Sequence, residues 1–239
     1  MTDLVKQAQE HHKALQAQAN KPRGLENSTD RSDLIIPRAK KIEAMSPEMQ
    51  DTELLKSGIH PGVIINSITK EILPEKFIPV SYFKQWIRFN ANKEGDRGWV
   101  DGYGPRDVIY NTQDKNDIRL SSDAIWEGDL PPVTTTFLCF LALFEGQDIP
   151  VVLSFGGTNF RTGKTLLSLA TFKGGDLFSN RYRLTTKKKS NEMGTWFVFD
   201  VTFAGKAEGE EYAKAEAMYE TFKPADAKIH EDAEPGSEG

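Results

Sequence analysis

The stretch FIPVSYFKQWIRF, residues 77–89, predicts a long β-strand. Four of its residues fall on alternate positions: Tyr82, Lys84, Trp86 and Arg88. Alternate residues of a strand share one face of the sheet. Two aromatic rings and two cations on a shared face are typical of a surface on which bases stack. The competing interpretation is that both rings cover a second layer of core while both cations extend to solvent.

Further strand signals occur along the chain, separated by turns that contain glycine. They cover residues 63–66, 133–144, 151–155, 164–172, 180–189 and 195–205. Short strands at this spacing predict a mainly β barrel or sandwich rather than alternating strands and helices. The sequence predicts three parts: an N-terminal helix and linker (1–33), a body (34–222) that ends in a helix at about 207–222, and a disordered acidic tail (223–239).

Composition excludes several classes of protein. The single cysteine, Cys139, rules out an internal disulfide framework, and four scattered histidines provide little for a metal centre. We therefore expect no metal and no cofactor. The longest apolar run, residues 137–144, is too short to cross a bilayer, and the first residues lack the apolar core of a signal peptide. We expect a cytoplasmic protein that does not bind membranes.

Catalytic motifs give no support for an enzyme. Gly163-Lys164-Thr165 resembles the end of a phosphate-binding loop, but the glycine required five residues earlier is Thr158. Since residues 164–172 are predicted to be a strand, residues 161–164 are predicted to be a hairpin turn. Acidic residues are frequent between 90 and 130, where a metal-dependent nuclease site would find ligands, but their spacing singles out no pair.

Charge is distributed unevenly along the chain. Residues 155–189 carry eight cations and one acid, a net charge of +7, whereas residues 205–239 carry four lysines and ten acids, a net charge of −6. A basic body followed by an acidic tail is typical of a protein that binds a polyanion and carries a competing anion of its own. The alternative is a solvated basic face with a tail that aids solubility.

Single-strand binding proteins combine cations for the phosphates with flat rings for the bases. The predicted nucleic-acid-binding residues are Tyr82, Lys84, Trp86, Arg88, Phe160, Arg161, Lys164, Lys173, Arg181, Tyr182, Arg183, Lys187, Lys188 and Lys189. The predicted partner-binding residues of the tail are Asp226, Glu231, Asp232, Glu234 and Glu238.

Short pieces of the sequence resemble a known group of phage proteins. They are IPRAK at 36–40, PG at 61–62, NS at 66–67, TKE at 69–71, FIPV at 77–80, YFK at 82–84 with Trp86, LSF at 153–155, GK at 163–164, Tyr182 with Leu184, and GTWF at 194–197. The pieces up to Trp86 look like a group of tailed-phage early proteins. The later pieces resemble the single-stranded DNA-binding proteins of tailed bacteriophages, which are of OB-fold type.

The resemblance implies an OB-like five-stranded barrel with long inserted loops, flanked by an N-terminal and a C-terminal helix. It also implies a protein that coats single-stranded DNA without catalysis during phage replication or recombination, in the cytoplasm of the host cell. The acidic tail would then bind replication or recombination proteins. One departure concerns that tail, which ends in EPGSEG rather than in an aromatic residue.

Two other functions stay open at this point: a phage regulatory or adaptor protein that docks on a host or phage enzyme, and a metal-dependent nuclease. The oligomeric state is also open, a homodimer included.

The tail provides a prediction of its own. Its carboxylates are tethered near the basic body at an effective concentration on the order of millimolar, so they compete with DNA for the same cations. Deleting residues 224–239 should raise the affinity for single strands, more at low salt than at high salt, because salt screens the competing contact. Binding curves of both proteins that coincide at every salt concentration would reduce the tail to a solubility device.

Overall fold

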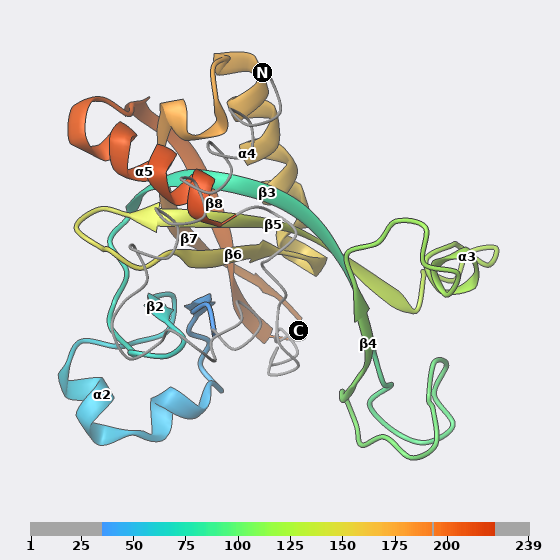
Figure 1. The fold of residues 1–239 in the computed structure, drawn as a ribbon. Helices are drawn as coiled ribbons and strands as arrows, with labels where there is room; N and C mark the ends of the chain where they lie inside the picture. Colours follow the sequence, from blue (N-terminus) through green and yellow to red (C-terminus); the bar gives the residue numbers. More distant parts are fainter. Residues whose placement is uncertain (1–34, 193, 223–239) are drawn as a thin grey trace, which may run out of the picture. The chain divides into compact units, whose positions relative to one another are not determined.

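The centre of the described chain is a six-stranded antiparallel sheet with the order β6-β5-β3-β7-β8, and β4 pairs with β3 beside this path (Figure 1). The computed structural model describes residues 35–192 and 194–222. Contacts divide the chain after Ile35, and the unit described below begins at Ile36. The strands are β3 (Lys76–Phe89), β4 (Val108–Thr112), β5 (Thr134–Phe144), β6 (Val151–Phe155), β7 (Asn180–Asn191) and β8 (Gly194–Lys206). The prediction of a mainly β protein is confirmed.

Strand β3 organises the sheet because it pairs with three neighbours. β5 runs beside nearly its whole length, whereas on the other side β7 meets only its start and β4 only its end. The register with β5 shifts between Pro79 and Ser81, at the position where a proline cannot donate to a ladder. The two ends of β3 therefore belong to different surroundings.

Two helices cover opposite faces of the sheet. Helix α4 (Phe160–Lys173) packs through Leu166 on the core cluster that contains Phe144. Helix α5 (Gly209–Thr221) packs on the cluster that contains Leu143. Adjacent residues of a strand point to opposite faces, so these two clusters lie on the two sides of β5.

The sheet does not close into the expected five-stranded barrel. Its two ends, β6 and β8, approach each other closely enough for the rings of Phe155 and Phe199 to meet edge to face at 5.6 Å, but no ladder joins these two described strands. The free edge of β6 is met by the segment around Pro37, whose carbonyl accepts from the Val152 amide at 2.8 Å. A curled, open sheet thus replaces the barrel.

Side chains satisfy the free edge of β8. The Phe197 amide donates to the carboxylate of Glu43 at 3.1 Å, and the Phe197 carbonyl accepts from the Lys41 ammonium. Lys41 and Glu43 also form an ion pair of 2.6 Å, and Glu43 is only 7% exposed. A buried carboxylate therefore does here what a neighbouring strand does in a closed barrel.

Two residues further along, the same edge is bound by the start of α4. The Phe199 amide donates to Asn159 Oδ1 at 2.7 Å, and the Phe199 carbonyl accepts from Thr162 Oγ1 at 2.8 Å. These bonds fix the first turn of α4 against β8.

The prediction of a strand at 164–172 and of a turn at 161–164 is wrong, because both segments belong to α4. Gly163, Leu166 and Ala170 are buried at helical spacing. A Cβ atom on Gly163 would lie 2.7 Å from that of Phe155, so the helix approaches the sheet closely where it has no side chain. The glycine spacing still speaks against a phosphate-binding loop.

Residues 90–133, called the arm below, contain β4 and α3 and extend beyond the ends of β3 and β5 (Figure 1). The shorter elements are β1 (Ala39–Lys41), η2 (Pro47–Gln50), α2 (Thr52–Lys56), β2 (Ile64–Asn66), α3 (Leu120–Asp123), η3 (Gly157–Asn159) and η4 (Leu177–Ser179). The predicted N-terminal helix and linker and the predicted acidic tail lie outside the described residues.

The β8 edge provides a stability prediction. Replacing Glu43 by Ala leaves the half-buried Phe197 amide without its acceptor and should lower the free energy of unfolding by about 1–3 kcal/mol. The matched control is Glu145→Ala, which breaks only the exposed Lys76–Glu145 ion pair of 3.0 Å and should cost less than about 1 kcal/mol. Urea unfolding measures both, and equal losses of stability would contradict the role of Glu43.

Candidate nucleic-acid interface

The four predicted residues of β3 face the side of the sheet that carries α4. Opposite them in the ladder with β5, in chain order of β3, stand Phe140, Leu138, Thr136 and Thr134. Phe140 and Leu138 belong to the core beneath α4, and the two threonines continue that face beyond the helix. The face therefore changes from apolar to polar along β3.

Tyr82 lies at the apolar end of this face and Trp86 near the polar end. The Tyr82 ring packs 5.1 Å from the ring of Phe140, and burial raises the pKa of its hydroxyl. Trp86 is partly exposed and has threonines as neighbours on both adjacent strands. Between them Lys84 is exposed and forms no ion pair with any residue that the structure describes. Lys84 is the most exposed member of the group, and Trp86 is half-buried, as are Tyr82 and Arg88.

Arg88 is bound by a carboxylate of the arm. Its guanidinium donates to Asp123 at 2.7 Å, and the same carboxylate oxygen accepts from the Tyr110 hydroxyl at 3.0 Å. Tyr110 also bonds Thr134 at 2.9 Å, and the Arg119 guanidinium lies 4.1 Å from its ring centre. Arg88 thus ties the arm to the sheet, with its charge already compensated.

Helix α4 brings further cations to the same face of the sheet. Arg161 and Lys164 are exposed on it, and the Lys164 ammonium lies 4.9 Å from the ring centre of Phe160, which packs on the core. The adjacent Gly163 lies over Leu138, the ladder partner of Lys84. Residues 156–175 contain no carboxylate at all.

The predicted residues of β7 do not join this group. Tyr182 is fully buried between core rings, and burial raises its pKa to about 12. Arg181 pairs with Glu211 at 3.1 Å, and Arg183 pairs with Glu75 at 3.3 Å. These arginines are engaged on the side of the sheet that carries α5.

The lysines near the end of β7 are accessible. They pair with β8 in the sheet and do not lie beside α4. Lys187 pairs with Asp200 at 2.9 Å. Lys188 and Lys189 are exposed and form no ion pair with a described residue. On the C-terminal end of α4, the Lys173 ammonium lies 4.3 Å from the ring centre of Phe203. The structure thus groups the β3 and α4 residues and separates them from those of β7.

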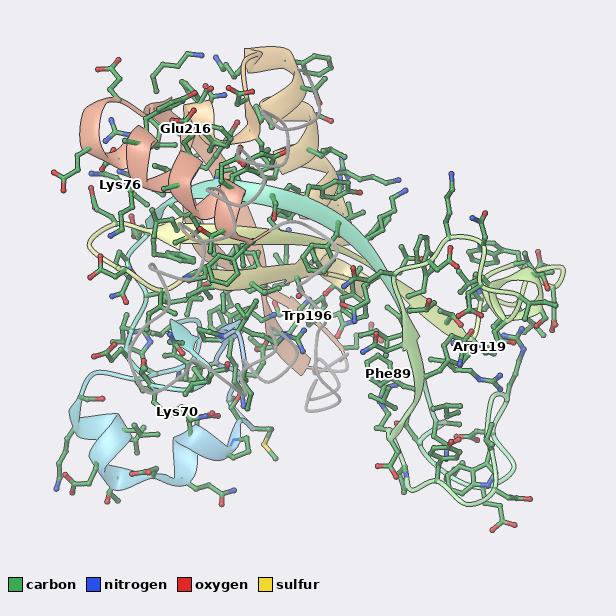
Figure 2. All side chains as sticks on the ribbon, in the orientation of Figure 1. Lys70, Lys76, Phe89, Arg119, Trp196 and Glu216 are labelled. Carbon is green, nitrogen blue, oxygen red and sulfur yellow. The ribbon has the colours of Figure 1, made fainter. Side chains whose placement is uncertain are left out.

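The arm and helix α5 carry the opposite charge. The arm has nine acids and five cations, and α5 has four acids and one lysine. Figure 2 shows Glu216 on α5 and Arg119 on the arm. Four large apolar side chains of the arm are at least half exposed: Ile118, Ile125, Trp126 and Leu130. Sequence patterns do not single them out, because a loop without periodicity gives no signal of exposure.

The described residues offer no cluster of three or more His, Cys, Asp or Glu side chains that could hold a metal ion. The Cys139 thiol is buried, and burial raises its pKa to about 11, so it stays protonated at neutral pH. Among the helices that the structure describes, none combines the length and the apolar character that crossing a bilayer requires.

Comparison with known proteins gives one finding. The family described as Pam3 phage gp34-like protein matches residues 5–228, which is nearly the whole chain. No curated protein and no solved structure matches the chain. The family match agrees with a phage origin, as the resemblance in the sequence implied. By this match, the chain belongs to the family of Pam3 phage gp34-like proteins.

Proposed function

We propose that the protein binds and coats single-stranded DNA, without catalysis, during phage DNA replication or recombination. The binding surface is the α4 face, defined as Lys84 and Trp86 of β3 together with the exposed residues Arg161 and Lys164 of α4. One observation carries the proposal: the two helices that cover the sheet have opposite charges, and the helix without a single carboxylate lies beside Lys84 and Trp86.

Charge supports binding on this face rather than elsewhere. A phosphate backbone is attracted to a surface where cations are free of carboxylates and repelled by acidic surfaces. Lys84, Arg161 and Lys164 have no carboxylate partner among the described residues. The acids of α5 and of the arm disfavour a polyanion on those two surfaces.

The position of Trp86 supports a single strand rather than a duplex. Its ring belongs to the sheet and is partly exposed. A base that is paired inside a duplex cannot stack on such a ring, whereas a base of a single strand can turn onto it. Thr136, beside it on β5, provides a hydroxyl for sugar or phosphate groups.

The adaptor function has an observation of its own. The apolar side chains exposed on the arm are typical of a surface that binds another protein. The surrounding loop is braced, since Arg97 donates to Glu127 at 2.9 Å and Glu127 and Leu130 form a bridge. A protein that binds no oligonucleotide even at low salt would contradict DNA binding and leave the arm as the functional surface.

The charge of α4 can be tested by substitution. Replacing Arg161 and Lys164 together by Ala should weaken binding to a thymidine oligomer and reduce the salt slope by about 0.7 for each phosphate that is no longer neutralised. The matched control replaces Lys93 and Lys115 of the acidic arm, and it should bind like the wild type. Fluorescence anisotropy at several salt concentrations measures both, and equally weakened binding in the two variants would show only an effect of net charge.

Stacking on Trp86 can be tested separately from charge. Trp86→Ala should cost on the order of 1–3 kcal/mol of binding free energy with little change in the salt slope, because a ring contributes no counterion release. Trp126→Ala, on the arm, is the control and should bind normally. An oligonucleotide that saturates the wild type should quench tryptophan fluorescence, and this quenching should shrink in Trp86→Ala. A folded Trp86→Ala variant with wild-type affinity contradicts the assignment.

A further inference from the structure

Only two of the fourteen phenylalanines are exposed. Phe172, near the end of α4, is 85% exposed, and Phe203, on β8, is 37% exposed. Lys173 joins them, because it follows Phe172 in the chain and its ammonium lies 4.3 Å from the ring centre of Phe203. The Phe203 ring is held in place because it packs against the ring of the buried Tyr182, with 6.1 Å between the two ring centres.

Phe172 lies on the outward stripe of α4. Residues three or four apart in a helix share a side, and the exposed residues follow this spacing: Arg161, Lys164, Thr165, Ser168 and Phe172. From Arg161 to Phe172 the helix rises about 16 Å. Cations therefore stand at one end of the stripe, hydroxyls in the middle and an aromatic ring at the other end.

Both ends of α4 contact β8, at Phe199 and at Phe203, and its start also lies over β5. Near its start, Gly163 lies over Leu138, next to Lys84 and two residues from Trp86 in the β3 ladder. At its end, Lys173 reaches Phe203 on β8. A strand of DNA that follows the stripe passes from the Trp86 end of the surface to the Phe172 end.

We propose that Phe172, together with Lys173 and Phe203, forms a second base-stacking point, and that the single strand runs along α4 between Trp86 and Phe172. This inference rests on the proposed function and adds a path to it. Arg161 and Lys164 bind phosphates at the start of the path, and the hydroxyl of Ser168 donates a hydrogen bond to a phosphate oxygen further along. A base then stacks on the exposed ring of Phe172, a position that is sequence-tolerant because every base has a flat face.

Two separate stacking points make the effect of a substitution depend on oligonucleotide length. A short thymidine oligomer can occupy the Trp86 end without reaching Phe172, whereas a long one covers both. Oligomers of about 4 and about 16 nucleotides bracket the site sizes of single-strand binding domains. Phe172→Ala should weaken binding of the long oligomer roughly 5- to 150-fold and leave binding of the short one unchanged.

Two further variants separate stacking from other effects. Phe172→Trp keeps a flat ring and should bind the long oligomer like the wild type, whereas Phe172→Leu keeps only apolar surface and should behave like Phe172→Ala. Because the side chain is exposed, none of these variants should shift the urea unfolding midpoint, which checks that each is folded.

The outcomes are distinct. If the wild type binds the long oligomer and Phe172→Ala binds it equally well, the second stacking point is wrong and the proposed function is untouched. If Phe172→Ala weakens the short and the long oligomer alike, the path from Trp86 to Phe172 is wrong. If the wild type binds neither oligomer at low salt, the proposed function and the inference both fail.

Discussion

The arrangement of the molecule depends on how the free edge of β8 is satisfied. A strand edge that faces the interior without a partner leaves amide and carbonyl groups unpaired, which is costly. Here Lys41 and Glu43 bind Phe197, and Asn159 and Thr162 bind Phe199. The sheet therefore curls without closing. Asn159 directly precedes α4 and Thr162 lies in its first turn. The bonds to Phe199 therefore also hold that helix across the face of the sheet.

This constraint positions the candidate surface. With its first turn bound to β8, α4 crosses the core and brings Gly163 against Leu138, beside Lys84. The glycine lets the helix lie close to the sheet, so its cations stand directly next to the partly exposed part of β3. A helix held only by apolar contacts would leave this juxtaposition less defined, because packing is less directional than hydrogen bonding.

Much of the sheet can be predicted from the sequence because its strands have strong periodicity. The run at 77–89 and the alternation of Phe197, Phe199 and Val201 correspond to β3 and β8. The segment 164–172 is a helix against prediction, because the buried positions of α4 include a glycine and an alanine, which give a weak apolar signal at helical spacing. The predicted barrel is wrong because closure depends on tertiary contacts of Glu43 and Asn159, which leave no local pattern.

In the candidate site, too, some features can be predicted from the sequence and others depend on tertiary contacts. The shared face of the β3 residues follows from strand geometry alone, and the structure has it. Segments distant in the chain determine three other features of the site. They pair Arg88 with Asp123, pair Arg181 with Glu211, and bury Tyr182. Clusters of cations and rings in the sequence therefore overestimate how many of these side chains lie together, and the fold brings those of β3 and α4 to one face of the sheet.

The most direct measurement of the central claim is a titration of the full-length protein with a thymidine oligomer and with a duplex of equal length, each at two salt concentrations. The account predicts that the single strand binds more tightly than the duplex. It also predicts that the affinity for the single strand falls steeply with salt, by about 0.7 in the logarithmic slope for each phosphate neutralised. Equal or tighter binding of the duplex, or no binding of the oligomer at the lower salt concentration, would contradict it.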